Sequence, residues 1–316
     1  MMKNLIVSSS PHIRTKTSTS TIMRDVLIAL TPAAVAGIVL FGWKALLIIA
    51  VCVTSSILSE AIFNMICKKK QTIFDLSAAV TGLILALCLP ASTEIWQCVV
   101  GSVFAIIVVK CLFGGIGCNF ANPAATARVF MLIAFASSVG GGVATNFASA
   151  DLIASATPLE LIKYGNTETL PSLLDMLLGN RGGAIGETCV IALVVGGLYL
   201  IIRRVIYWHT PAIYIGTVFL LSLAIKQDVT IALYEILGGG LMIAAFFMIT
   251  DYVTTPINKT GKMVFAFGCG VITVLIRFWG SYPEGASFAI LLMNILAPYI
   301  EKLCTKKPLG KAGKNA

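Results

Sequence analysis

The sequence predicts an all-α polytopic membrane protein with about ten transmembrane helices, arranged as two inverted five-helix repeats that contain discontinuous helices. Of the 316 residues, 58% are hydrophobic and only 12% are charged, about half of the roughly 25% that a soluble domain carries. About ten apolar segments follow one another along the chain. The lysines and arginines concentrate in alternate connections between these segments, which is typical of a multi-pass membrane protein.

The apolar segments form two groups of five, and most reach the ~20 residues that a helix needs to cross a ~30 Å hydrocarbon core. They cover residues 25–43, 44–66, 75–90, 95–113 and 123–139, and then 185–203, 210–225, 229–250, 262–280 and 285–303. The predicted parts are a tail (1–24), a first repeat (25–139), a polar connection (140–184), a second repeat (185–303) and a basic tail (304–316).

The third segment of each group is the one predicted to be discontinuous. Residues 75–90 would span only about 24 Å as a helix and end at Pro90, and residues 229–250 are interrupted by Gly238-Gly239-Gly240. Short or glycine-interrupted segments at matching places are typical of broken helices around a buried site. Five spans per group would place the two groups in opposite orientations. Ten spans without internal symmetry remain the alternative.

The distribution of positive charge predicts the topology. If the N-terminus is cytoplasmic, all but five of the 23 lysines and arginines lie in or near inner connections and the two tails, Lys110 and Arg128 among them. This bias predicts cytoplasmic N- and C-termini and an extracytoplasmic 140–184 connection. The same bias explains the net charge of +9 as a consequence of membrane topology, so the charge does not indicate a nucleic-acid partner. The five outer residues are Lys44, Lys163, Arg181, Lys226 and Arg277.

The sequence predicts no catalytic residue and no metal site on this chain. The only histidines are His12, in the polar tail, and His209, in an inner connection, so no Ser/His or Cys/His pair lies in the apolar core. Cys111 and Cys118 are close in sequence, but two thiols without a nearby histidine make a poor metal site. No phosphate-binding or dinucleotide-binding fingerprint follows a predicted strand.

Glu60 has two interpretations, and Arg277 with Glu284 is a candidate ion pair. Glu60 lies deep in an apolar segment, where it belongs either to an ion path or to a set of polar contacts between helices. In the outer connection after the ninth segment, Arg277 and Glu284 are close enough in sequence to form an ion pair.

Several stretches together resemble one membrane family. The stretch from Gly114 to Pro123 suits either a close approach to a ring or another subunit, through Gly114, Gly115, Gly117, Asn119 and Asn122, or a plain tight turn. With Phe113 and Ala124 at its ends, this stretch resembles the integral-membrane D subunits of Rnf-type ferredoxin:NAD oxidoreductases, which are similar to the B subunits of sodium-pumping NADH:quinone oxidoreductases. The resemblance extends to Ser10–Arg14, Thr250–Pro256 and Arg277–Pro298 and covers nearly the whole chain.

The resemblance implies a covalent flavin. In this family, FMN is carried through a phosphoester bond by the threonine of a pattern similar to Asp-x-x-Ser-Gly-Ala-Thr. Asp151, Ala156 and Thr157 match that pattern, whereas Ala154 and Ser155 replace its usual serine and glycine. Thr157 is therefore the expected attachment residue and Ser155 the alternative hydroxyl. Thr157 followed by Pro158-Leu159-Glu160 also suits the capped start of a helix, and the two roles are compatible.

The resemblance further implies a non-covalent riboflavin, a flavin transferase for maturation, and a place in the bacterial inner (plasma) membrane. As one subunit of an Rnf complex, the chain would pass electrons between reduced ferredoxin and NAD, coupled to Na⁺ or H⁺ movement. A channel or solute transporter without a redox cofactor is the alternative, because inverted repeats with broken helices are also typical of transporters.

Overall fold

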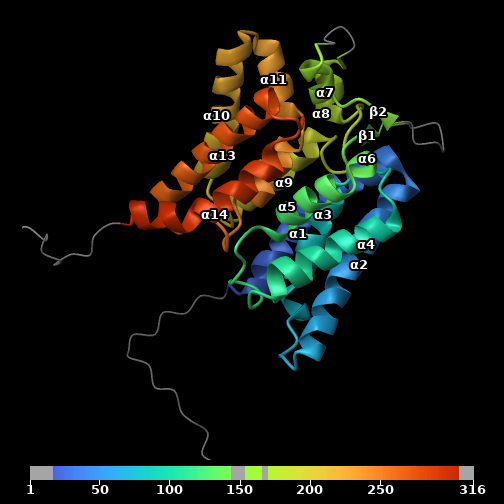
Figure 1. Ribbon diagram of the computed structural model, residues 1–316, viewed down its shortest axis with the longest axis vertical. Helices are drawn as coiled ribbons and strands as arrows, with labels where there is room; N and C mark the ends of the chain where they lie inside the picture. The colour runs from blue at the N-terminus through green and yellow to red at the C-terminus, as the bar shows by residue number, and fades with distance from the viewer. Residues whose placement is uncertain (1–16, 144–153, 166–169, 306–316) are drawn as a thin grey trace, which may run out of the picture.

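The computed structural model describes residues 17–143, 154–165 and 170–305, and most of this part of the chain is helical (Figure 1). Its only sheet is a two-stranded antiparallel pair in which Gly142 opposes Ser155. An all-helical polytopic membrane protein is therefore confirmed. The strands are β1 (Gly142–Val143) and β2 (Ala154–Ser155).

The helices fall into the two predicted groups, joined by a connection whose described part contains two short helices. The first group is α1 (Thr19–Phe41), α2 (Trp43–Ile66), the 3₁₀-helix η1 (Ile73–Asp75), α3 (Ser77–Cys88), α4 (Ile95–Val103), the π-helix η2 (Phe104–Cys111), α5 (Pro123–Ala134) and α6 (Ala136–Val139). The connection contains α7 (Pro158–Lys163) and α8 (Leu173–Leu178). The second group is α9 (Val190–Ile202), α10 (His209–Lys226), α11 (Val229–Leu237), α12 (Leu241–Ile243), the π-helix η4 (Ala244–Met248), α13 (Lys259–Trp279) and α14 (Ala286–Cys304).

Within the described residues, five helices are long and apolar enough to cross a membrane by themselves: α1, α2, α10, α13 and α14. A sixth span consists of α11 followed by α12 and η4, with a bend of 63° at the break. The remaining apolar helices, α3, α4 with η2, α5 and α9, are shorter. These ten elements coincide with the ten apolar segments of the sequence.

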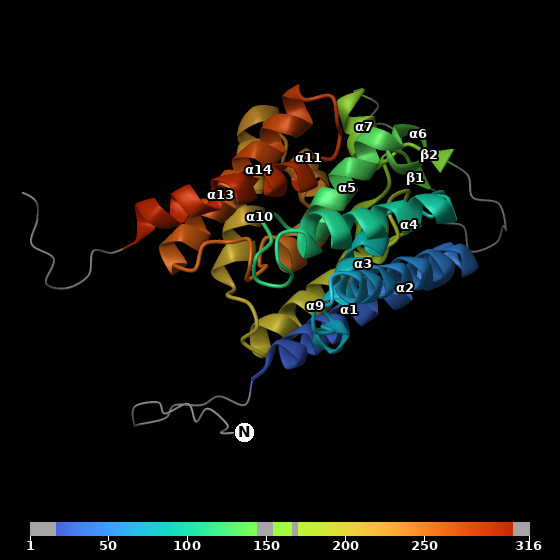
Figure 2. The same cartoon turned by 60° about the horizontal axis from the view of Figure 1, so that its bottom comes forward.

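The two groups repeat the same internal packing. In the first, α2 contacts α3 and α4, and α5 packs on α4 and η2; in the second, α10 contacts α11 and α13, and α14 packs on α13. Equivalent helices also meet across the groups, because α1 packs on α9 and α5 packs on α14 (Figure 2). This arrangement is what a twofold relation between two repeats requires.

Contacts between α1 and α9 show that these equivalent helices are antiparallel. Near the start of α1, Asp25 Oδ2 lies 3.1 Å from the Arg203 guanidinium at the end of α9. Near the end of α1, Gly37 is so close to Ile185, which precedes α9, that an added Cβ would lie 2.6 Å from Ile185 Cγ2. Equivalent helices that run in opposite directions support an inverted repeat.

Glycine sets the close approach of the two repeats, which leads to a stability prediction. A Cβ on Gly196 would lie 2.0 Å from the backbone oxygen of Ala29, so neither helix can keep its place if Gly196 gains a side chain. Gly196→Ala should lower the free energy of unfolding by about 1–3 kcal/mol, although alanine is the better helix former by about 1 kcal/mol. Denaturant unfolding in detergent micelles measures this change.

Gly216→Ala in α10 is the matched control, because a Cβ there meets nothing within 4 Å. It should leave stability unchanged or raise it by up to about 1 kcal/mol. Equal stability of the two variants would contradict the close packing of α1 and α9.

The third segment of the second repeat is discontinuous, as predicted, whereas the third segment of the first repeat is the single short helix α3. α3 begins directly after Leu76, which has a left-handed backbone (φ 60°), and all of α3 is buried. α12 begins directly after Gly239 (φ 67°) and Gly240 (φ 65°), where glycine avoids the steric cost of this conformation. In the third segment of each repeat, a residue with a left-handed backbone therefore directly precedes the start of a helix.

Candidate functional site

Three cations that the sequence places in or near loops lie inside helices instead. Lys110 is in η2, Arg128 in α5 and Arg277 in α13, and none of their side chains is more than 4% exposed. The predicted Arg277–Glu284 pair is wrong. Glu284 lies 2.7 Å from Arg128 of the first repeat, and Arg277 turns back into its own repeat. The topology prediction does not need these three residues, because the tails and the Lys68–Lys70 connection carry the bias.

Glu60 belongs to a buried polar cluster between α2, α3 and η2. Lys110 Nζ donates to Glu60 Oε1 at 2.8 Å and to Ser77 Oγ at 2.7 Å, and the Thr72 hydroxyl donates to the same Glu60 oxygen at 2.6 Å. The other carboxylate oxygen, Oε2, is buried without a partner among the described residues. These bonds match the predicted polar contacts between helices, and the ion-path role stays a prediction.

Arg277 holds the break in the third segment of the second repeat. Its guanidinium donates to Glu235 Oε2 at 2.8 Å and to the backbone oxygen of Gly238 at 3.1 Å. The Gly239 N–H donates to Glu187 Oε1 at 2.6 Å. Lys110 has the equivalent place in the first repeat, since it ends the fourth span and contacts Ser77, the first residue of α3. In each repeat, a buried cation near the end of the fourth span thus contacts the third segment.

Thr157 is the N-cap of α7, and it forms a capping box with Glu160. The Thr157 hydroxyl oxygen accepts the Glu160 N–H at 3.3 Å, and the Thr157 N–H donates to Glu160 Oε2 at 2.8 Å. Pro158 occupies the first helical turn, where its fixed φ suits the helix. The predicted capped helix start is confirmed. Thr157 itself is only 5% exposed.

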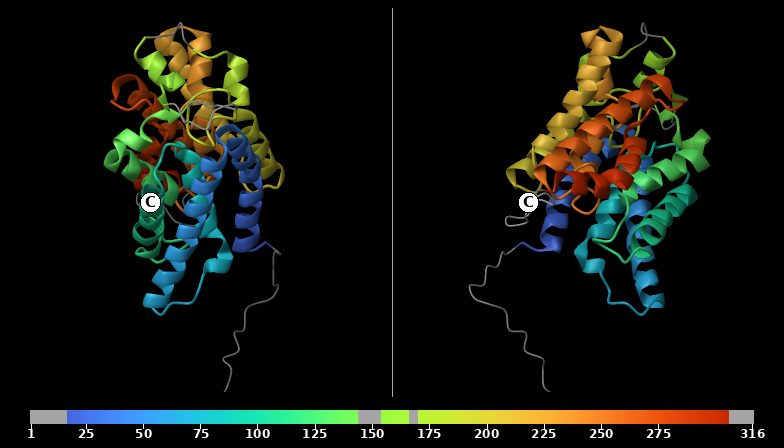
Figure 3. Two further views of the ribbon diagram at one scale, coloured as in Figure 1. Left: turned by 90° about the vertical axis from the view of Figure 1, so that its right-hand side faces the viewer. Right: turned by 60° about the vertical axis from the view of Figure 1, so that its left-hand side comes forward.

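α7 is seated on the broken span of the second repeat, at one end of the bundle (Figures 1 and 3). The Leu159 side chain is 3% exposed and fills the space beside Gly238 and Gly239, where an added Cβ would lie 3.1 Å and 2.2 Å from its carbon atoms. At the other end of α7, Lys163 Nζ donates to the backbone oxygen of Gly280 at 2.6 Å, and burial lowers the pKa of this amine. The helix that follows Thr157 is therefore fixed to α11 and to the α13–α14 connection.

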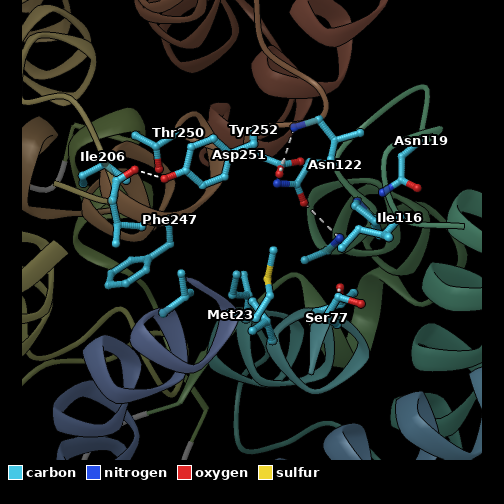
Figure 4. Close-up of a pocket in the computed structure, with 18 of the residues that line it drawn as sticks. Met23, Ser77, Ile116, Asn119, Asn122, Ile206, Phe247, Thr250, Asp251 and Tyr252 are labelled. Atoms are coloured by element: carbon cyan, nitrogen blue, oxygen red, sulfur yellow. Dashed lines mark hydrogen bonds between the residues drawn. The ribbon is translucent and has the colours of Figure 1, made fainter. Parts of the chain in front are cut away.

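A second candidate site is a cavity of about 90 Å³ at the interface of the repeats. Figure 4 shows Asn119, Asn122 and Asp251 on one side of it and Met23 and Ser77 on the other. Asn119 Oδ1 is buried without a hydrogen-bond partner in the described part of the chain. Further lining comes from Lys110, Thr250, Tyr252, Phe247 and Ile116.

The predicted site residues therefore divide between two places. Asn119 and Asn122 line the cavity, whereas Thr157 lies outside its lining. Gly114, Gly115 and Gly117 have φ values of 121°, 94° and 93°, so this stretch needs glycine for its backbone, and a Cβ on Gly115 or Gly117 would meet nothing. Ala156 is exposed. Asp151 lies outside the described residues, and Ser155 is placed only through its pairing in β2.

Sequence reasoning missed Ser77, Lys110 and Asp251 as neighbours in one cavity. One signal was available, since Asp251 lies in the Thr250–Pro256 stretch that carries part of the resemblance. Nothing in the sequence brings that stretch to the start of α3 and the end of η2.

Comparison with known proteins identifies the relatives of this fold. A profile of the NQR2, RnfD, RnfE family matches residues 6–310. The chain belongs to this family. It is 48% identical over 311 residues to the D subunit of the Na⁺-translocating ferredoxin:NAD⁺ oxidoreductase complex of Acetobacterium woodii, covering 97% of this chain and 96% of the relative.

Two further members of the NQR2, RnfD, RnfE family show the same full-length match. Identity is 39% over 321 residues to the D subunit of the proton-translocating ferredoxin:NAD⁺ oxidoreductase complex of Clostridium ljungdahlii, covering 98% of this chain and 97% of the relative. Identity is 33% over 330 residues to the D subunit of the ion-translocating oxidoreductase complex of Stutzerimonas stutzeri, covering 94% and 93%. The family resemblance in the sequence is confirmed.

Proposed function

We propose that this chain is the membrane-embedded, flavin-carrying subunit of an Rnf-type complex. It would carry FMN as a phosphoester on Thr157 and pass electrons between reduced ferredoxin and NAD, with coupled Na⁺ or H⁺ movement. Relatives named for each of these ions match along their whole length, so the proposal keeps both ions. The other subunits of the complex supply the nicotinamide and ferredoxin sites, because this chain has no fingerprint for either.

The proposal rests on the hydrogen bonding of the Thr157 hydroxyl. Its oxygen accepts one hydrogen bond, from the Glu160 N–H, and its hydrogen is donated to no described residue. A phosphoester replaces that hydrogen and leaves oxygen lone pairs for the N–H. The hydroxyl can therefore be esterified without loss of the bond that caps α7, so the residue fits the group.

Burial limits when the flavin can be attached. Thr157 is 5% exposed with α7 in its seat, and a transferase needs the hydroxyl to be accessible. Attachment therefore precedes the docking of α7 or requires α7 to lift from Gly238 and Gly239. Once bound, FMN supplies one- or two-electron transfer, and this chain supplies its position through Thr157, Leu159 and Lys163.

The cavity between the repeats is the proposed place of the non-covalent riboflavin. Asn119 offers an amide of the kind that binds a flavin ring edge, since its Oδ1 is without a protein partner in the described chain, whereas the Asn122 amide caps α5 and donates to the Met248 backbone oxygen. The volume of about 90 Å³ is below the ~300–1,000 Å³ of most ligand pockets. Riboflavin therefore requires lining side chains such as Phe247 and Met23 to move outward.

Mass spectrometry of the 151–163 peptide from the purified protein tests the attachment. The proposal expects the mass of one FMN, less water, on Thr157, and flavin released by denaturation is the separate riboflavin fraction. An unmodified peptide from protein that was produced with its transferase would contradict the proposal. Solute uptake by the lone, flavin-free chain in liposomes would instead support the transporter alternative.

A further inference from the structure

A cavity away from both flavin sites lies between the α1–α2 turn and the α3–α4 turn. Its volume is about 830 Å³, large enough for a headgroup and part of an acyl chain. Trp43 and Trp96 line it and are 73% and 53% exposed. Leu47 and Ile48 of α2 add an aliphatic wall. Tryptophan at the ends of membrane spans is typical of the bilayer interface, and the cavity lies at such ends.

The polar side of this cavity contains groups whose bonding is incomplete. Lys44 is exposed and forms no ion pair or hydrogen bond with the residues that the structure describes. The Thr93 residue is 6% exposed, and its hydroxyl oxygen has no partner among those residues. An exposed cation and a buried, unpartnered hydroxyl thus line the same cavity, and both are groups that can bind a phosphate oxygen.

Glu94 is the second charged residue that lines this cavity. Its carboxylate accepts bonds from the Gln97 N–H and the Trp96 indole N–H, and it forms no ion pair in the described chain. A carboxylate has about four lone-pair sites, so it can accept further donors. Lys44 and Glu94 together carry no net charge, which fits a zwitterionic headgroup with its own ammonium donor.

We propose that this cavity binds one molecule of phosphatidylethanolamine. The phosphate lies against Lys44 and Thr93, the primary ammonium against Glu94, and one acyl chain between the tryptophans and α2. Phosphatidylcholine cannot donate from its headgroup, and phosphatidylglycerol brings a net negative charge to Glu94. Both should therefore bind more weakly.

Tryptophan quenching by brominated lipid tests the site in the full chain. The four tryptophans are Trp43, Trp96, Trp208 and Trp279. In the Trp208→Phe/Trp279→Phe variant, the fluorescence comes only from the two cavity tryptophans. In the matched Trp43→Phe/Trp96→Phe variant, it comes only from Trp208 and Trp279, which report contact with bulk lipid. Each is reconstituted in phosphatidylcholine vesicles with increasing amounts of phosphatidylethanolamine brominated on its acyl chains.

Half-maximal quenching of the cavity tryptophans should need roughly tenfold less brominated phosphatidylethanolamine than brominated phosphatidylcholine or phosphatidylglycerol. Lys44→Ala and Thr93→Val should each remove most of this preference, whereas Lys226→Ala, at another predicted outer position, should not. Equal quenching by all three lipids would assign the cavity to bulk lipid and overturn the proposal. Quenching that falls as protein density rises would assign it to a second copy of the chain, which also overturns it.

Discussion

Replacing Thr157 with asparagine or valine should abolish the covalent flavin completely. Both side chains lack a hydroxyl, so neither can form the phosphoester. The readout is the yellow-green fluorescence of the chain band on a denaturing gel under ultraviolet light, which retains only covalently bound flavin. Wild-type protein made with its transferase should fluoresce, and both variants should be dark.

The two substitutions separate attachment from folding. Asparagine is as good an N-cap as any residue, whereas valine is a poor one and should cost about 0.5–2 kcal/mol by leaving the Glu160 N–H without its acceptor. Thr157→Asn should therefore remain as stable as the wild type while losing its flavin. A dark and stable Thr157→Asn variant assigns the loss to the hydroxyl and not to an unfolded α7.

Ser155→Ala is the matched control for the neighbouring hydroxyl, and it should keep full fluorescence. The site assignment would be wrong if Ser155→Ala were dark and Thr157→Asn fluorescent. Flavin that denaturation releases from Thr157→Asn is expected in either case, since it reports the separate riboflavin.

Much of the fold follows from the sequence, because a membrane leaves few choices for an apolar segment. The ten segments, the break at Gly238–Gly240 and the short α3 all lie where hydropathy, glycine and Pro90 predict them. The capped start of α7 was predictable for a local reason, since Thr157, Pro158 and Glu160 are within four residues of one another.

The ion pairs were not predictable, because their partners come from distant parts of the chain. Arg128 and Glu284 are 156 residues apart and belong to different repeats. Because Arg277 and Glu284 are close in sequence, an ion pair between them was the expectation. In the structure, α13 keeps Arg277 within the bundle, where its guanidinium bonds Glu235. The π-helical turn η2 also escapes a pattern analysis, since apolar periodicity does not distinguish it from an α-helix.

The cavity needed tertiary structure for the same reason. Its walls come from α1, α3, the segment before α5 and the end of η4, and only the approach of the two repeats brings these elements together. The sequence singles out Asn119 and Asn122 without showing that they line this cavity.

Removing the charge of Arg277 should have the largest effect on stability of any single substitution considered for this protein. Arg277→Met leaves the Glu235 carboxylate buried without its partner, and also removes the donors to the backbone oxygens of Glu235 and Gly238. Breaking a buried pair from one side typically costs about 3–5 kcal/mol. Unfolding by sodium dodecyl sulfate in mixed micelles should show a loss of this size.

A double substitution divides that loss into its parts. Arg277→Met/Glu235→Met removes both charges, and a pair of apolar side chains is often nearly as stable as a buried ion pair. It should recover the part due to the lone carboxylate but not the part due to the backbone oxygens, and should lie between the wild type and Arg277→Met. Arg204→Met, at an exposed arginine, should stay within about 0.5 kcal/mol of the wild type.

Arg277→Met should also affect the segment that carries Thr157, because hydrogen bonds and side-chain packing connect Arg277 to α7. Arg277 bonds the Gly238 oxygen, Gly239 is bonded to Glu187, and Leu159 of α7 fills the space beside both glycines. Loosening the break should loosen α7, so hydrogen exchange of α7 amides should quicken in Arg277→Met and not in Arg204→Met. Unchanged protection of α7 would show that its seat does not depend on Arg277, and would restrict the effect of Arg277 to the broken span itself.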